Sequence, residues 1–217
     1  MPSEFPRSPK ILKGALVAYQ LPELLPTIIM FQYNPDQMRR SLQPRIARGG
    51  GRGDAQRIDG PPEESISLTV EIDASDQLEF PAQNGITVAV GLHPALAALE
   101  GLMYPAFPTV VANQVLAALG SGIILSEMAP LALFIWGPTR VLPVVVTSIA
   151  ITEQAFDPHL NPIRASVDLS LKVLTYRELD MTNPGYWVYM ASFAQKEVMA
   201  ALNLAQNASA IKGILPF

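Results

Sequence analysis

The sequence predicts an α+β protein built mainly on antiparallel β-structure, and one long hairpin carries most of this prediction. From Ile163 to Val173, apolar residues occupy every odd position, and polar or charged residues occupy the even positions. Successive side chains of a strand point to opposite faces, so this segment is predicted to be a strand with one buried and one solvated face. The segment 140–154 precedes it, and the proline-containing turn 156–162 joins the two into an antiparallel hairpin.

Five further strands are predicted outside this hairpin. The clearest runs from Glu64 to Asp73, where isoleucine, leucine and valine alternate with serine, threonine and glutamate. The first hairpin strand, 140–154, is rich in valine and isoleucine and has little charge, so either both its faces are covered or one face contacts a neighbouring subunit. The other predicted strands are Ile11–Tyr19, Thr27–Tyr33, Arg39–Arg48 and Leu131–Trp136.

Three helical segments are predicted. The segment Gly85–Tyr104 carries an apolar stripe at helical spacing, made of Leu92, Leu96, Leu99 and Met103, and we expect it to cover the dry face of the sheet. The alanine- and valine-rich segment Thr109–Leu119 is predicted to be a second helix. A third helix is predicted over Trp187–Asn207, followed by a loose tail from Asn207 to Phe217.

The composition limits the classes of function. Hydrophobic residues make up 49% of the 217 residues, and charged residues make up only 16%, against about 25% in an average soluble domain. Such a chain is expected to bury apolar surface against partner subunits. The net charge of -4 argues against nucleic acid as the main partner. The chain has no cysteine, and its first residues lack the pattern of a secretion signal, so we expect a cytoplasmic protein.

The segment Gly101–Ser126 contains no charged residue and is long enough to span a bilayer. It is interrupted by two prolines and several polar or glycine residues, and it lacks basic flanks. A buried or interface-lining segment is therefore the preferred interpretation, and no membrane partner is predicted.

The segment Arg48–Arg57 is glycine-rich, but it lacks the Gly-Lys-Ser/Thr that a phosphate-binding loop requires. It belongs to a basic region within an acidic chain. Such a region either pairs with an acidic neighbour or is simply a solvated loop, and the sequence favours neither. The arginines of this region are Arg39, Arg40, Arg45, Arg48, Arg52 and Arg57.

No catalytic, metal-binding or cofactor-binding residue is predicted. The two histidines, His93 and His159, have no second ligand at metal-binding spacing. Acidic residues near Asp73 do not follow the calcium-loop pattern. Asp157 and Asp168 form a conceivable acid–base pair, but Asp168 belongs to the regular wet face of a strand, and nothing in the sequence places the two in one pocket.

Several short segments, taken in order, resemble the tube and baseplate proteins of contractile injection systems. These segments are Phe31-Gln32-Tyr33-Asn34-Pro35 with Arg39 and Ser41, the strand Ile66–Asp73, Phe134-Ile135-Trp136-Gly137, and Phe156 with Asn161-Pro162-Ile163-Arg164-Ala165. The resemblance covers residues 10–180. Many members of this family carry a LysM module after the tube-like domain, but no LysM-like repeat follows Asp180 here.

The resemblance implies a tail-tube-like domain over 10–180, with an apolar elaboration at about 104–130 and a C-terminal helix and tail at 181–217. The implied fold is a β-sandwich or barrel with a flanking helix, assembled as a hexameric ring that contacts adjacent tube and baseplate proteins. The expected lumen-facing residues are Arg164, Ser166, Asp168, Ser170 and Lys172. The expected subunit-interface residues are Phe31, Tyr33, Asn34, Arg48, Arg52, Arg57 and Trp136.

On this interpretation the protein is a non-enzymatic structural component at the junction between tube and baseplate. Three alternatives remain at the level of sequence. One is a main inner-tube subunit that stacks in many layers. Another is a small-ligand-binding or enzymatic β-domain that uses carboxylates such as Asp157 and Asp168. The third is a membrane-associated protein that inserts the segment 101–126.

Overall fold

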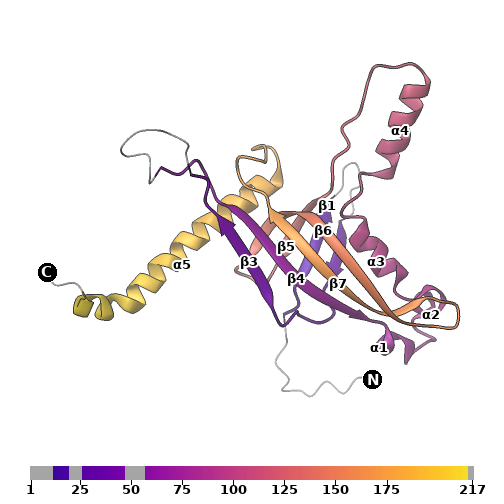
Figure 1. The fold of residues 1–217 in the computed structure, drawn as a ribbon, viewed down its shortest axis with the longest axis horizontal. Helices are drawn as coiled ribbons and strands as arrows, with labels where there is room; N and C mark the ends of the chain where they lie inside the picture. Colours follow the sequence, from indigo (N-terminus) through magenta and orange to yellow (C-terminus); the bar gives the residue numbers. More distant parts are fainter. Residues whose placement is uncertain (1–11, 20–25, 47–56, 215–217) are drawn as a thin grey trace.

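The seven strands form one antiparallel sheet, with the order β2-β1-β5-β6-β7-β4-β3 (Figure 1). The computed structural model describes residues 12–19, 26–46 and 57–214, with side chains up to residue 207. The strands are β1 (Ala15–Tyr19), β2 (Thr27–Met30), β3 (Met38–Gln43), β4 (Glu63–Asp73), β5 (Leu131–Ile135), β6 (Val141–Phe156) and β7 (Pro162–Val173). The predicted α+β class is therefore confirmed, and so is the long hairpin.

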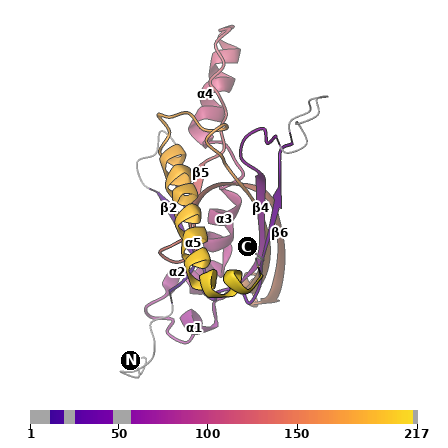
Figure 2. The same ribbon diagram turned by 90° about the vertical axis from the view of Figure 1, so that its left-hand side faces the viewer.

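The predicted sandwich or barrel is wrong, because the described strands form one open sheet whose edges are β2 and β3. Helices, and not a second sheet, cover the dry face. Figure 2 shows the sheet curling around α3 (His93–Glu100), with β2 and β5 on one side and β4 and β6 on the other. The sheet curves around this helix, but its edge strands β2 and β3 do not pair, so the sheet stays open.

Alternation along β4 and β7 separates the two faces of the sheet as the sequence predicts. Val167, Leu169 and Leu171 are buried on one face, and the polar residues between them lie on the other. The register places Ile66 opposite Leu171 and Leu68 opposite Leu169, so apolar side chains pair with apolar ones across the two strands.

A β-bulge in β6 preserves this separation in the neighbouring strand. Val146 pairs with Leu171 and Ser148 pairs with Ser170, which leaves Thr147 as an extra residue. The Thr147 hydroxyl donates a hydrogen bond of 3.0 Å to the carbonyl oxygen of Ser170. A bulge shifts the alternation by one residue. Val144 and Val146 before the bulge and Ile149 and Ile151 after it therefore lie on the same dry face.

The core lies between this dry face and α3. Leu92, Leu96 and Leu99 are buried in it, as predicted, but Met103 is exposed and Leu102 is buried in its place. The predicted helix is in fact two short helices, α2 (Gly85–Val90) and α3. The two helices are separated by Gly91, whose φ of 59° is unfavourable for other residues. A side chain at this position would also collide with the carbonyl oxygen of Pro162. Because α3 ends at Glu100, the helical spacing does not extend to Met103.

Two helices project from the body on opposite sides (Figure 1). The helix α4 (Phe107–Ala118) is close to the predicted 109–119 segment, and its residues are not buried within the chain. The helix α5 (Pro184–Ile214) is longer than predicted, and the expected loose tail is helical as far as Ile214. Within the described part of the chain, no helix has the length and hydropathy needed to cross a membrane.

Candidate functional site

The face of the sheet opposite the core carries a continuous polar surface over β3, β4, β7 and the second half of β6. We call it the polar face. The registers of these strands place Ser67 beside Ser170, and Thr69 beside Asp168. The polar face consists of Arg39, Ser41 and Gln43 on β3, Glu63, Ser65, Ser67, Thr69, Glu71 and Asp73 on β4, Arg164, Ser166, Asp168, Ser170 and Lys172 on β7, and Ser148, Ala150, Thr152 and Gln154 on β6. All five predicted lumen-facing residues belong to it.

Charges on the polar face are of both signs, and several are paired locally. Arg164 donates to Asp73 over 2.8 Å (Nε) and 2.7 Å (Nη2). The hydrogen bond from Ser75 and the nearby Arg164 guanidinium hold the pKa of Asp73 below its ordinary range. The Thr69 hydroxyl donates to Asp168 over 2.5 Å, and Lys172 pairs with Glu178 over 2.5 Å. The surface is therefore hydrophilic without a large excess of either charge.

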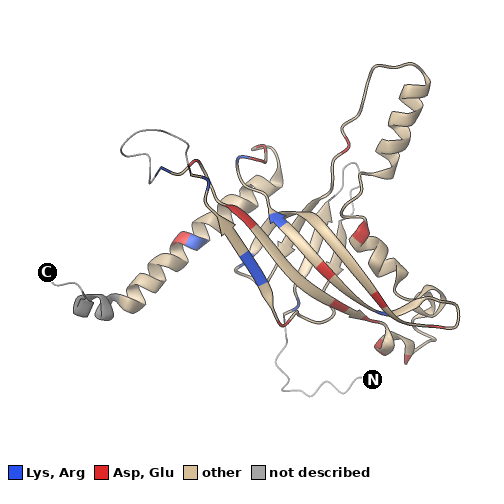
Figure 3. Ribbon diagram, viewed as in Figure 1, with Lys and Arg blue, Asp and Glu red and all other residues tan. Residues whose placement is uncertain are grey.

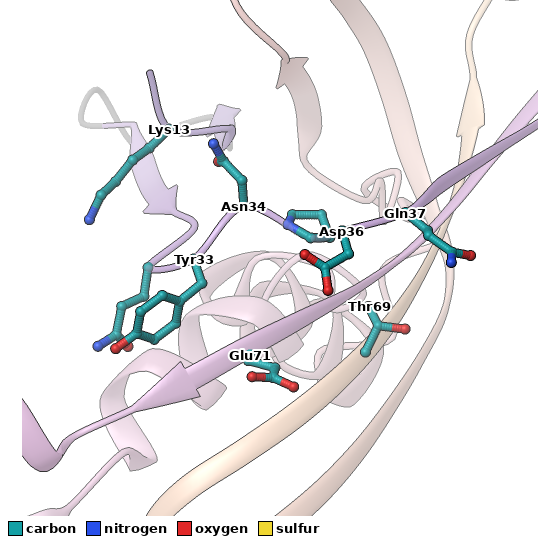
Figure 4. Close-up of a pocket in the computed structure, with 9 residues that line it drawn as sticks. Lys13, Tyr33, Asn34, Asp36, Gln37, Thr69 and Glu71 are labelled. Carbon is teal, nitrogen blue, oxygen red and sulfur yellow. The ribbon is translucent and has the colours of Figure 1, made fainter. Parts of the chain in front are cut away.

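A hollow of about 760 Å³ lies at one side of the polar face, between β4 and the segment 32–37 that follows β2. Figure 4 shows Tyr33 on this segment and Glu71 on β4 facing the same space. The Tyr33 side chain is 49% exposed. The lining includes one lysine, Lys13, and two carboxylates, Asp36 and Glu71. This mixture is polar, but it does not converge on a single point as the groups of a catalytic site do.

Two amide side chains fix the segment 32–37 against the sheet. The Gln32 amide donates to the carbonyl oxygen of Asp73 over 2.7 Å and accepts from its backbone N–H over 2.8 Å. Asn34 accepts from the backbone N–H of Gly14 over 2.9 Å and donates to the carbonyl of Leu12 over 2.8 Å. Each amide thus makes the pair of backbone hydrogen bonds that a neighbouring strand would otherwise make. The sequence pattern did not predict this role, although two amides flanking an exposed aromatic residue were a possible signal for it.

The predicted interface residues lie in different environments. Phe31 is 1% exposed in the core of its own chain, which leaves its side chain almost no surface for a neighbouring subunit. Trp136 is half-buried and stacks on Phe134, with ring centroids 5.8 Å apart. Tyr33, Asn34 and Arg57 are exposed, whereas Arg48 and Arg52 lie outside the described residues.

The structure separates the two carboxylates of the enzymatic alternative. Asp157 lies in the hairpin turn, where it accepts hydrogen bonds from the backbone N–H groups of His159 (2.7 Å) and Asn161 (2.8 Å). Hydrogen bonds from Asn161 hold its pKa below the ordinary range. Asp168 lies six residues into β7, about 20 Å along the strand from the turn. Among the described residues, no group of three or more histidine, aspartate or glutamate side chains is arranged to hold a metal ion.

A buried ion cluster on the dry face was also missed. The side chain of Glu64 is only 4% exposed and accepts from Arg40 (Nε, 2.9 Å; Nη2, 2.5 Å) and from Lys196 of α5 (2.9 Å). Burial acts to raise the pKa of Glu64, but the hydrogen bonds from Lys196 and Arg40 outweigh it and hold that pKa below its ordinary value. Glu64 lies at an even-numbered position of β4, on the same face as Ile66 and Leu68. A carboxylate on the dry face of a regular alternation could therefore have indicated a buried ion pair.

Comparison with known proteins gives little additional information. No family model and no curated protein matches the chain. One chain in a solved virion of a native gene transfer agent particle matches 74% of this chain and 90% of its own length, at 13% sequence identity and a TM-score of 0.29. At that TM-score the match establishes neither a shared fold nor a shared role.

Proposed function

We propose that the protein is a non-enzymatic structural subunit of a phage-tail-like particle, in which several copies form a ring with the polar face toward an enclosed passage. The single observation that carries this proposal is the polar face itself. Four adjacent strands present serine, threonine and paired charges on one side and a closed apolar core on the other. A wall of this composition can contact water and passing macromolecules without strong adhesion.

The edges of the sheet supply a route to ring closure. The edge strand β2 exposes Ile28 and Met30, and exposed edges with apolar side chains are commonly covered by a partner. In the proposed ring, β2 of one copy approaches β3 of the next, which extends the sheet around the passage and removes both edges. The sequence resemblance supports six copies and a position where a tube meets its baseplate.

Chemical labelling of an assembled oligomer tests the proposal, and the absence of native cysteine makes single cysteines usable as probes. Ser67→Cys places a thiol at the centre of the polar face, and Thr182→Cys places a matched thiol on the exposed segment before α5. A small maleimide is expected to react at both positions. A maleimide on a large polymer is expected to react in the ring only at position 182, whereas in dissociated subunits it should react at both.

Equal reaction of the polymer reagent at both positions of the assembled protein would show that the polar face faces outward. A protein that stays monomeric at all concentrations and in the presence of its particle would also contradict the proposal. Catalytic turnover by isolated subunits would favour the enzymatic alternative.

A further inference from the structure

We propose that copies of this chain join head to tail, with the acidic end of one copy docking into the angle between α5 and the sheet of the next. The inference depends on the proposed function only in that both require copies to associate. The two docking surfaces lie apart from each other on the molecule, and the proposal comes from how charge and apolar surface are distributed between them.

The first surface, which we call the basic end, surrounds a cavity of about 280 Å³ where α5 leaves the sheet. Arg40 of β3, Arg140 before β6 and Lys196 of α5 line this cavity. Arg40 and Lys196 share the single buried carboxylate of Glu64, and Arg140 forms no salt bridge with another described residue. Glu197 follows Lys196 on α5 and reduces the positive charge, but three basic residues against two carboxylates still leave an excess that a carboxylate from outside could neutralise.

The second surface, which we call the acidic end, is formed by α1 (Ser75–Leu78) and the residues that follow it. Asp76 and Glu79 are exposed there, and neither forms a salt bridge within the described part of the chain. Figure 3 shows the acidic residues of α1 toward one end of the long axis, whereas the basic residues of β3 and α5 lie nearer the middle, the one on α5 next to an acidic residue.

Apolar side chains accompany the charges on both surfaces. Beside the acidic end, Phe80 and Ile86 are exposed. Beside the basic end, Met199 lines the cavity, and Val198 and Leu202 continue along the uncovered part of α5. The two ends are thus complementary in charge and alike in being partly apolar, which is the composition of a protein–protein interface with a polar rim.

A second copy is the occupant that this pattern favours, because each chain supplies both complementary surfaces. Two different surfaces in contact make a heterologous interface, which leaves one free end of each kind. Such contacts continue until a ring closes, or they extend a stack of subunits. A partner of different sequence would need to supply only an acidic segment, and the experiment below separates the two cases.

Sedimentation or mass photometry of purified wild-type protein is expected to show association that weakens between about 0.05 M and about 0.5 M NaCl, because salt screens the contact. Arg140→Glu and Glu79→Arg should each raise the dissociation constant at least about tenfold. Arg39→Glu is the matched control, since Arg39 lies on the polar face beside Arg40 in sequence and carries the same charge. It should leave association nearly unchanged.

Mixing the two single variants provides the decisive measurement. The intact acidic end of Arg140→Glu meets the intact basic end of Glu79→Arg, so the mixture should associate at concentrations at which each variant alone is dissociated. Arg140→Gln, which removes the charge without adding a carboxylate near Glu64, and a melting curve for each variant exclude misfolding as the cause.

Equal weakening by Arg39→Glu, or a mixture that fails to associate, would overturn the inference. So would wild-type protein that is monomeric at low salt and binds only an acidic partner of other sequence. Rings that form normally with Arg140→Glu would refute this contact while leaving the proposed function intact.

Discussion

Parity along a strand decides the environment of each side chain in β4 and β7. Ser170 and Leu171 are neighbours in sequence, yet one is on the polar face and the other is fully buried. The sequence alone was sufficient here, because the alternation is regular over eleven residues and only one register buries the apolar set. It was insufficient for Glu64, whose burial depends on Lys196, a residue 132 positions away.

Charge placed on the two faces of β7 should have unequal effects. Val167 is 0% exposed, so Val167→Asp forces either an unpaired buried charge or a protonated carboxyl, and we expect a loss of about 4 kcal/mol or more in the free energy of unfolding. Ser170→Asp adds the same group to the polar face and should cost less than about 1 kcal/mol. Urea denaturation of both variants measures the difference, and equal losses would contradict the assignment of the faces.

Contact between elements depends on long-range partners that no local pattern reveals. The N-terminal part of α5 packs on the sheet through Tyr189 and Ser192, and the Lys196–Glu64 ion pair follows one turn later. Beyond this point the described residues of α5 are exposed. The helical period of the sequence predicted a helix here, but not where it leaves the sheet, since alanine, valine and leucine continue without a break.

Removing the buried carboxylate tests this anchor. Glu64→Gln leaves Arg40 and Lys196 without their shared anion, and we expect a loss of about 2–3 kcal/mol at neutral pH, because both partners are partly solvated. Glu63→Gln is the matched control: Glu63 is the adjacent residue on the exposed face, and its pair with Arg45 should contribute no more than about 1 kcal/mol.

The stability that Glu64 contributes should also depend on pH in a defined direction. Its pKa in the folded protein lies below the ordinary value of 4.5, so the unfolded state binds a proton more readily. The contribution is therefore complete above pH 4.5 and is lost as the pH falls through the folded pKa. Urea denaturation at about pH 7 and about pH 3.5 should show the gap between wild type and Glu64→Gln narrowing at the lower pH. A gap that widened in acid would contradict the ion cluster.

At the scale of the whole molecule, two projections on opposite sides leave much apolar surface uncovered. On α4, Phe107, Val111 and Val115 follow one another at four-residue spacing, and all three are exposed. The charge-free segment 101–126 suggested burial or an interface. In the described chain, its helical part is not buried, which leaves the interface as a prediction. The composition indicated excess apolar surface, but it could not show that this surface lies on α4 and α5, the two helices that project from the core.

Association that covers the projecting helices should make thermal stability depend on protein concentration. A partner that binds only the folded chain stabilises it by mass action, so raising the concentration about a hundredfold should raise the melting temperature by roughly 5 °C. The double variant Val111→Ser, Val115→Ser should match wild type in dilute solution, because both side chains are exposed in the single chain. Its rise at high concentration should be smaller than that of wild type, because contacts through other surfaces remain. Scanning calorimetry across a dilution series measures both effects, and a double variant that melts lower even when dilute would mean that α4 packs on its own chain.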